Sequence, residues 1–255
     1  MTFSEANVTE TSHSTSVPSR RPRHRPRSHV SASPAAPHSD SVLIARPDFN
    51  VRLADSAKVR RDAASLIRRM YATRGYRFDA NELPASPHHV TFMVHGDSEA
   101  IGTLTLRFDS ADGLLAAQLY GPELEACRGR QGIACELAWF AFDPQQGTKE
   151  LLASLFHVVY IYARLLRRAT QMFIEVNPRH AGFYRRALGF RVVGPERVCQ
   201  RVGAPAVFLC LDLAYADQQI EQFAGRGEPI GRTLYPYCLS AIERENLYHR
   251  IVEMA

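Results

Sequence analysis

Two neighbouring stretches in the first half of the chain carry the apolar and β-branched patterning that is typical of β-strands. They are VTFMVHG at residues 90–96 and AIGTLTLRF at residues 100–108, and the turn sequence GDSEA joins them. A short connection of glycine and polar residues between two such runs predicts an antiparallel hairpin. An earlier alternating run, DFNVRLA, predicts that the ordered part of the chain begins near Pro47.

Two later stretches have apolar residues at helical spacing. The first runs from Ser56 to Tyr71 and is expected to end at Gly75. The second lies within residues 133–190, where an apolar strand precedes it and the strand MFIEV follows it. A turn, NPRH, and a short helix that carries Tyr184 complete this region. A strand, a crossover helix and a second strand form a βαβ unit, which requires parallel pairing and a right-handed crossover.

The order of these elements predicts one main domain. After Gly189, FRVVG and AVFLCLDLA indicate two further strands. Together these elements predict an α/β (α+β) domain with a mixed, mostly antiparallel sheet and one parallel crossover. We assign residues 1–44, rich in Ser, Thr, Pro and Arg, to a disordered tail, residues 45–215 to the domain, and residues 216–255 to a C-terminal helical extension packed on it.

Composition narrows the possible functions. The chain has no run of eighteen apolar residues, which argues against a membrane span. Its five scattered cysteines form no CxxC pair, so they favour a reducing, cytoplasmic location over a disulfide framework or a zinc site. No P-loop, GxGxxG motif or clustered His and Asp set is present, and we expect no metal ion. The basic run Arg20–His29 is better explained as a solvated tail than as a nucleic-acid contact, and no nucleic-acid partner is expected.

Two residues of the βαβ region are candidates for catalysis. Glu136 lies within an apolar strand, where burial would raise the pKa of its carboxyl toward neutrality and suit it to act as a general base. The alternative is a strand-edge glutamate that faces water. Tyr184 could protonate a departing thiolate, and the alternative is a packing role.

A basic run surrounds the turn before Tyr184. It comprises Arg179, His180, Arg185 and Arg186. These side chains could receive a phosphopantetheine arm or an acidic carrier protein, and a solvated helix face explains them equally well.

Several motifs together resemble one superfamily. The strand that ends in FAFDP, the helix after it and the segment NPRHAGFYRRALGF resemble GNAT-like acyltransferases. More closely, CELAWFAFDP, LFHVVYIYARLL, IEVNPRHAGFYRRALGF and APAVFLCLDLAYADQQI resemble, in order, N-acyl amino acid synthases of the FeeM type. These are relatives of the acyl-homoserine-lactone synthases. The resemblance spans residues 50–240 and implies a GNAT-like fold with helices on both faces of the sheet.

The resemblance implies transfer of an acyl group from a thioester to a primary amine. Glu136 would act as the base or orient the amine, and Tyr184 would protonate the thiolate. The strand from Leu137 to Phe142 would splay from MFIEV and grip the pantetheine arm with free backbone groups. Donor binding is then assigned to Phe140, Ala141, Phe142, Gly147, Asn177, Arg179 and His180, and the substrate pocket to Thr103, Thr105 and Trp139.

The chain departs from the superfamily in two places. CoA-using members carry an (R/Q)xxGxG/A loop that holds the pyrophosphate at a helix N-terminus. Here that loop reads PQQGTKELL, with Gly147 as its only glycine. This favours acyl-phosphopantetheine on an acyl carrier protein as co-substrate over CoA, with no tightly bound cofactor. Trp139 stands where relatives often have a basic residue. The alternatives are a CoA-dependent N-acetyltransferase and a non-catalytic acyl or carrier-protein binding module.

Overall fold

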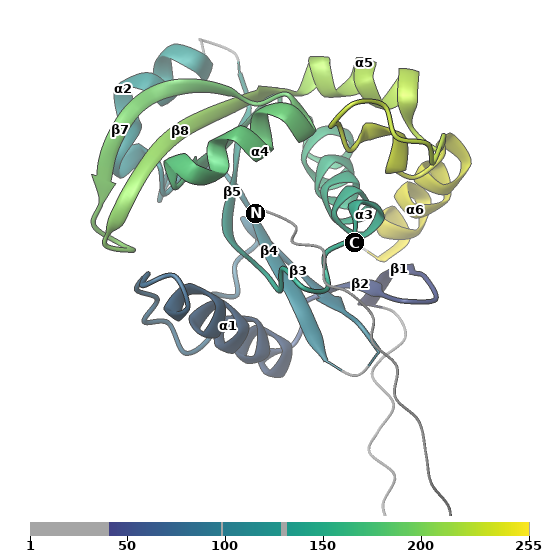
Figure 1. Cartoon of the computed structure of the whole chain (residues 1–255), viewed down its shortest axis with the longest axis horizontal. Coiled ribbons are helices and arrows are strands. Elements are labelled where there is room, and N and C mark those ends of the chain that lie inside the picture. The colour runs from purple at the N-terminus through teal and green to yellow at the C-terminus, as the bar shows by residue number, and fades with distance from the viewer. Residues whose placement is uncertain (1–40, 98, 129–131, 255) are drawn as a thin grey trace, which may run out of the picture. The chain divides into compact units, whose positions relative to one another are not determined.

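A computed structural model describes residues 41–97, 99–128 and 132–254. Within them the strands form one eight-stranded sheet in the order β1-β2-β3-β4-β5-β6-β8-β7 (Figure 1). The strands are β1 Val42–Ala45, β2 Asn50–Leu53, β3 His89–His95, β4 Ala100–Phe108, β5 Ala134–Phe142, β6 Gln171–Val176, β7 Arg191–Cys199 and β8 Ala204–Asp212. Of the pairs that these strands form, β5 with β6 is parallel and the others are antiparallel. The predicted mixed sheet with one parallel crossover is therefore confirmed.

The predicted hairpin is formed by β3 and β4. Its register aligns Thr91 with Thr105, and Phe92 with Leu104. Gly102 in β4 is required by packing, because a Cβ atom there would lie 2.4 Å from the Phe142 ring of β5. The hairpin thus extends directly into the central part of the sheet.

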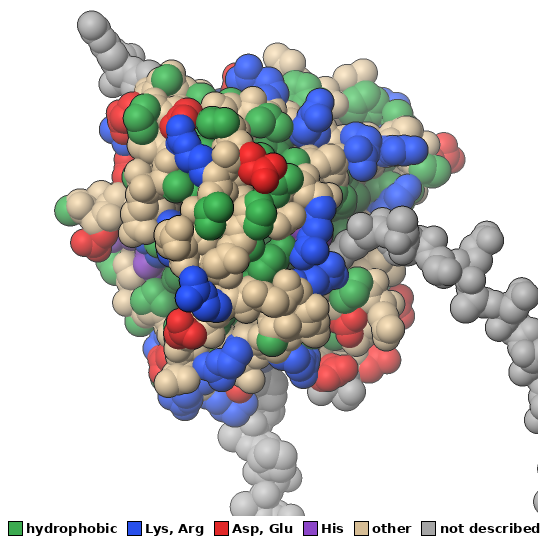
Figure 2. Space-filling model, turned by 60° about the vertical axis from the view of Figure 1, so that its left-hand side comes forward, with side chains coloured by type: hydrophobic (Ala, Val, Ile, Leu, Met, Phe, Trp, Pro, Cys, Tyr) green, Lys and Arg blue, Asp and Glu red, His purple; other side chains and the backbone are tan. Residues whose placement is uncertain are grey.

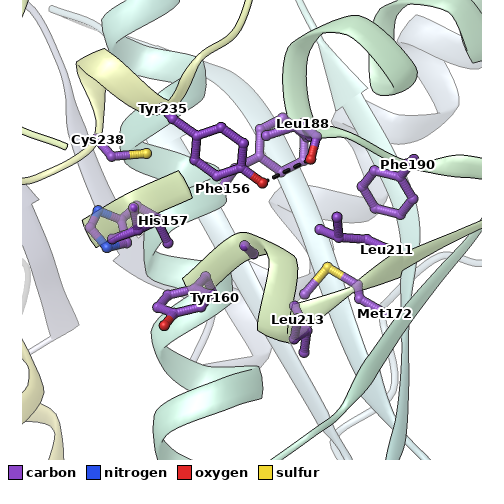
Figure 3. Close-up of a pocket in the computed structure, with 12 residues that line it drawn as sticks. Phe156, His157, Tyr160, Met172, Leu188, Phe190, Leu211, Leu213, Tyr235 and Cys238 are labelled. Carbon is purple, nitrogen blue, oxygen red and sulfur yellow. Dashed lines mark hydrogen bonds between the residues drawn. The ribbon is translucent and has the colours of Figure 1, made fainter. Parts of the chain in front are cut away.

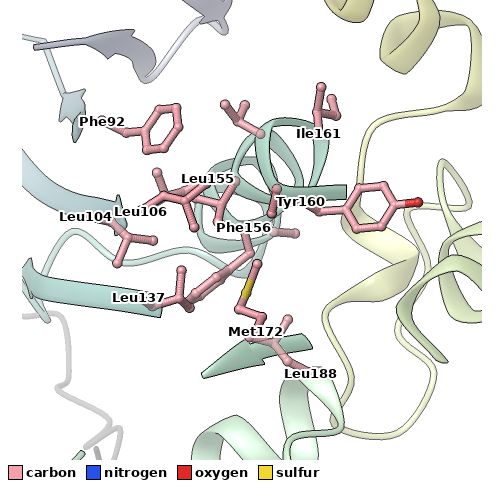
Figure 4. Packing of buried hydrophobic residues seen from close by; sticks show 14 of the residues in the cluster. Phe92, Leu104, Leu106, Leu137, Leu155, Phe156, Tyr160, Ile161, Met172 and Leu188 are labelled. Carbon is pink, nitrogen blue, oxygen red and sulfur yellow. The ribbon is translucent and has the colours of Figure 1, made fainter. Parts of the chain in front are cut away.

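The crossover helix is α3, Lys149–Tyr160, which continues as a π-helix, η2, over Ile161–Leu166. It begins where the Thr148 hydroxyl accepts a hydrogen bond from the Leu151 backbone N–H at 3.1 Å, an N-cap that satisfies one of the free donors of the first turn. Leu155 and Phe156 point toward Leu104, Leu106 and Leu137 of the sheet (Figure 4). Tyr160 points the other way, and its hydroxyl donates to Asp217 at 2.8 Å. The helix is therefore buried on both sides.

Helices cover both faces of the sheet, as the resemblance implies. In β3, Phe92 packs with the residues of α3, whereas the next residue, Met93, packs with α1, Ala57–Ala72. Because successive side chains of a strand point to opposite faces, α1 and α3 lie on opposite sides. The kinked helix α2, Ala117–Arg128, packs on Phe173 and Phe208 on the α1 side, and α4, Pro178–Leu188, packs on the α3 side (Figure 1).

The C-terminal segment consists of α5 Leu213–Phe223, the 3-10 turn η3 Tyr235–Tyr237 and α6 Ala241–Met254. Its apolar residues Leu213, Ile220 and Leu247 belong to the same core cluster as α3. Helix α5 starts directly after β8, three residues before the predicted start of the extension at residue 216. The extension therefore completes the main core.

One expectation about local structure is corrected. Strand β1 overlaps the end of the stretch predicted as a disordered tail, residues 1–44. Its residues Leu43 and Ile44 are only 1% and 5% exposed, and its backbone pairs with β2. The rest of that stretch, residues 1–40, lies outside the described residues. Helix α2 kinks at Tyr120, two residues before Pro122.

No helix in the three described ranges is long and apolar enough to cross a membrane. Nor do those ranges contain a group of three or more His, Cys, Asp or Glu side chains that could hold a metal ion.

Candidate active site

The parallel pair of strands opens at Leu137. The pairing of β5 with β6 covers Ala134–Leu137 and Gln171–Ile174, and no described strand pairs with β5 on that side beyond Leu137. On its other side β5 bulges, because Thr105 aligns with Ala138 whereas Thr103 aligns with Ala141. Two residues of β5, Trp139 and Phe140, therefore lie opposite a single residue of β4, Leu104. The sequence prediction of a strand that leaves its parallel neighbour agrees with this geometry.

The bulge holds Trp139 in a strained conformation. Its φ of 53° lies in the left-handed region, which a bulky side chain rarely adopts. Such strain costs on the order of 1–3 kcal/mol and persists only where the surrounding structure fixes it. The consequence is that Trp139 packs on the α1 side, against Phe78 and His89, while Phe140 packs on the α3 side, against Phe156.

Glu136 lies one residue before the opening and is buried, with 2% exposure. Its two carboxylate oxygens accept hydrogen bonds from the backbone N–H groups of Leu115, at 2.7 Å, and Ala116, at 3.0 Å. These donors belong to the turn that begins α2. The alternative of a strand-edge glutamate that faces water is therefore wrong, and Glu136 braces α2 against the sheet.

The environment of Glu136 raises its pKa to about 7. Burial is the main cause, and it is opposed by the Leu115 hydrogen bond and by the charges of Arg107 and Arg201. Each carboxylate oxygen has a second lone pair, so the group can still accept a proton at neutral pH. The role of Glu136 as a base stays a prediction.

Tyr184, in α4, lies on the opposite side of the sheet from Glu136. Its ring packs edge-on against Phe156 and Phe190, with centroids 6.4 and 5.8 Å apart. Burial raises the pKa of its phenol well above the ordinary value, and the hydroxyl forms no hydrogen bond with any residue that the structure describes. The group is therefore protonated at neutral pH and free to donate.

Tyr71, at the end of α1, is a second phenol near Tyr184, and the sequence analysis did not name it. Burial raises the pKa of the Tyr71 phenol, and the neighbouring Tyr76, Cys199 and Glu175 raise it further. Tyr71 in turn raises the pKa of Tyr184. Its ring contacts Tyr76 and Phe78 at 5.8 and 6.0 Å. Since Phe78 contacts Trp139, aromatic rings extend from α1 to the bulge. The amphipathic pattern of the helix gives no local sign of these contacts.

The predicted donor residues lie around the opening and the start of α4. Asn177 caps α4, because its side-chain oxygen accepts from the Arg179 N–H at 3.2 Å. Arg179 donates to the Tyr76 hydroxyl at 2.7 Å and to the His180 ring at 3.2 Å. The start of α4 is thus tied to the end of α1. Ala141 and Phe142 are nearly buried, and a Cβ atom at Gly147 would lie 3.0 Å from the Phe142 ring.

The predicted substrate-pocket threonines share the α1 face with Trp139 but are fully buried. The Thr103 hydroxyl donates to the Phe92 carbonyl at 2.9 Å, and the hydroxyls of Thr105 and Thr91 are hydrogen-bonded at 2.8 Å. Both hydroxyls therefore serve the sheet. Trp139 is the member of the predicted pocket with partial exposure.

A basic hollow lies beside α4. It has a volume of about 700 Å³ and is lined by Gly182, Arg185, Arg186, Phe190, Arg191 and Val192. None of its three arginines forms an ion pair with a described residue. Figure 2 shows Lys and Arg side chains at several places on the face it displays, with Asp and Glu side chains among them. Of the basic run noted in the sequence, Arg185 and Arg186 line the hollow and are available to an anionic partner.

A small apolar cavity of about 30 Å³ lies between α3 and the C-terminal segment (Figure 3). The Tyr235 hydroxyl donates to the Leu188 carbonyl at 2.8 Å on one side of it. His157 also lines the cavity, is 1% exposed, and neither ring nitrogen has a hydrogen-bond partner in the part of the chain that the structure describes. Burial, followed by the nearby charge of Arg244, lowers the pKa of His157 to about 3.

We expect His157 to make the fold sensitive to acid. Between about pH 6.5 and 3 the unfolded chain binds a proton at this residue and the folded chain does not. Stability should therefore fall with decreasing pH by up to about 1.4 kcal/mol per pH unit. Urea unfolding of wild type and His157→Leu at pH 7.5 and 5 measures the difference. His249→Leu, at an exposed histidine, is the matched control, and equal pH dependence of wild type and His157→Leu would contradict the expectation.

Comparisons with known proteins agree with this geometry. Residues 62–212 match the family described as N-acyl amino acid synthase FeeM. The fold is similar to that of FeeM, an N-acyl amino acid synthase from uncultured soil microbes, with 28% identity, a TM-score of 0.59, and coverage of 65% of this chain and 90% of FeeM. Weaker similarity links it to the AHL synthase LasI (14% identity, TM-score 0.48, 65% and 90% coverage) and to an acyl-CoA N-acyltransferase from Pseudomonas aeruginosa (15%, 0.44, 64% and 97%). No curated protein matches the chain significantly.

The mixed sheet that opens beyond one parallel pair, together with the family match, defines the chain as a GNAT-like, amide-forming acyltransferase. The chain belongs to the N-acyl amino acid synthase FeeM family. The family expected from the sequence motifs is thus confirmed.

Proposed function

We propose that the protein transfers a long-chain acyl group from an acyl carrier protein thioester to the amino group of an amino acid. The observation that carries this proposal is the departure of β5 from β6 at Leu137. An extended pantetheine arm could pair with the free edge of β5 as an added strand. The thioester at its end would then lie near Tyr184 on one side and Trp139 on the other.

The reaction needs one bond to form and one to break. The amine must first lose a proton, after which its lone pair attacks the thioester carbon and the second amine proton is lost as the amide forms. The C–S bond breaks, and the thiolate takes up a proton or accepts a hydrogen bond from Tyr184. Glu136, with its pKa raised to about 7, is the proposed proton acceptor on the amine side.

The start of α3 supports a carrier protein as donor. A CoA pyrophosphate would need free N–H groups and favourable charge at this helix N-terminus. Here the Thr148 side chain already caps the Leu151 N–H, and Glu150 places a carboxylate in the first turn. Repulsion between this carboxylate and a pyrophosphate disfavours CoA, whereas a carrier protein presents its single phosphate at its own surface.

The basic hollow beside α4 supports the same donor, because carrier proteins of this kind present acidic helices. Arg185→Glu combined with Arg186→Glu should raise the KM for an acyl carrier protein thioester about tenfold or more, since each reversal replaces attraction by repulsion. The KM for a truncated acyl-pantetheine thioester should not change. Thiol release that depends on an added amine provides the assay.

Lys58→Glu is the matched control, because Lys58 lies at the far end of α1 from the Tyr76 contact with Arg179. It should leave both KM values near those of wild type. Equal use of acyl-CoA and carrier thioester by wild type would favour the CoA-dependent alternative. Acyl binding without any thiol release would favour the non-catalytic one.

A further inference from the structure

A buried arginine on the α1 side of the sheet has no hydrogen-bond or ion-pair partner among the described residues. Arg107, in β4, is 8% exposed, and its guanidinium forms no hydrogen bond or ion pair with any described residue. Its Nε atom is wholly buried. The two terminal nitrogens of the guanidinium are not among the buried atoms, so the group keeps a small contact with solvent. An anion bound beside it would offset the cost of holding its charge in a mostly buried position.

The neighbours of Arg107 do not supply that anion. The sheet register places His89, Arg107 and Glu136 side by side across three strands. Glu136 turns its carboxylate to the Leu115 and Ala116 N–H groups, and no oxygen of it lies within 4 Å of Arg107. The other nearby carboxylate on this face, Glu175, is paired with Arg201 at 2.7 Å.

Three observations meet at the same place. The Arg107 guanidinium lies over the Trp139 ring, 5.6 Å from its centroid. The His89 ring lies edge-on to Trp139, with centroids 6.3 Å apart, and its Nδ1 atom is a second buried polar atom that no described residue hydrogen-bonds. Trp139 itself is held at positive φ by the bulge. Two unsatisfied polar groups around one strained aromatic residue are typical of a ligand site.

We propose that Arg107 binds the carboxylate of the acceptor amino acid, with Trp139 and His89 as walls of that pocket. This inference rests on the proposed function and names the residue that selects its acceptor class. Arg107 and Glu136 are cross-strand neighbours, so a carboxylate held by Arg107 places the amine of the same molecule near the opening of β5. The phosphate of a pantetheine arm is the wrong anion, since it lies at the end of the arm remote from the thioester.

The single tryptophan of the chain allows a direct test. Acceptor binding beside Trp139 should change its fluorescence in the absence of any acyl donor. A panel of amino acids, and the carboxamide of each amino acid, is titrated into the wild-type protein and into Arg107→Gln. Wild type should bind its preferred amino acid roughly 10–10²-fold more tightly than the carboxamide, because a charge-assisted bidentate pair is lost in the amide. Arg107→Gln should abolish this preference.

Two further measurements keep the test decisive. Arg197→Gln is the matched control, because Arg197 also lies over an aromatic ring but is paired with Glu123, and it should keep the wild-type preference. The thermal midpoint of Arg107→Gln should stay level or rise, since no ion pair is lost. Steady-state KM values for acid and amide decide the matter if the fluorescence does not change.

The outcomes separate the two claims. If Arg107→Gln acylates amino acids with an unchanged KM, or if wild type does not distinguish acid from amide, the inference about Arg107 is overturned and the proposed function stands. If no amine is acylated by wild type, the proposed function itself fails, whatever the fluorescence shows.

Discussion

Glu136→Gln is expected to reduce turnover about 10²-fold or more, because glutamine cannot take the proton of the attacking amine. The wild-type profile of kcat/KM against pH should rise through an inflection near the Glu136 pKa of about 7, and the variant should lack this inflection. Steady-state rates between pH 5.5 and 9 with a saturating acyl donor provide the measurement.

The same substitution should also weaken the fold. Glutamine replaces one acceptor oxygen by an NH₂ group that would face the N–H of Leu115 or Ala116, and an unmade buried hydrogen bond costs about 1–3 kcal/mol. Arg201→Met is the comparison for this structural part, because Arg201 donates a hydrogen bond to the Leu115 carbonyl of the same turn at 3.0 Å. Since the charge of Arg201 also lowers the pKa of Glu136, the inflection of this variant should move to higher pH. If Arg201→Met reproduces the loss of turnover and Glu136→Gln keeps the inflection, Glu136 positions α2 and is not the base.

Tyr184→Phe is expected to lower turnover by about 10–10²-fold and to leave stability nearly unchanged. The hydroxyl has no hydrogen-bond partner among the described residues, so its removal costs the fold little, and the ring contacts with Phe156 and Phe190 stay. Its raised pKa means that the phenol holds its proton more tightly than a thiol does, so we expect it to stabilise the departing thiolate by donating a hydrogen bond.

A thioester with a more acidic thiol tests this role. Such a leaving group needs less stabilisation, so the defect of Tyr184→Phe should shrink with an aryl thioester and stay large with a pantetheine thioester. Tyr235→Phe is the matched control, because its hydroxyl donates to the Leu188 carbonyl at 2.8 Å. It should lose stability, by about 1 kcal/mol, and keep its turnover. An equal defect of Tyr184→Phe with both thioesters would assign Tyr184 to packing.

Much of the fold follows from local patterns. The β3–β4 hairpin, the crossover through α3, and α4 with its Asn177 cap and its left-handed Gly189 all have period or capping signals in the sequence. Strand β1 was missed because four residues in a stretch rich in Ser and Pro give no measurable period. The π-helix at the end of α3 has no local sign either, since its residues continue the apolar helical pattern.

The site was predictable only in part. Alternation in TLTLRF sets Thr103, Thr105 and Arg107 on one face, so Arg107 could have been chosen with the two threonines. Alternation shows which residues of a strand share a face, but it does not show whether helices cover that face of the sheet. The sequence therefore gives no sign that α1 and α2 cover the face of Arg107 and that this residue is buried. The bulge at Trp139 depends on the pairing of β5 with β4, and the regular sequence LAWFAF does not reveal it.

The central claim is amide formation at the opening of β5, and mass spectrometry of the product tests it most directly. Purified protein is incubated with an acyl carrier protein thioester and a panel of amino acids labelled with ¹⁵N. We predict an N-acyl amino acid that retains the label, formed in equal amount with free carrier thiol. Free fatty acid as the product, or thiol release that does not depend on an amine, would contradict the account.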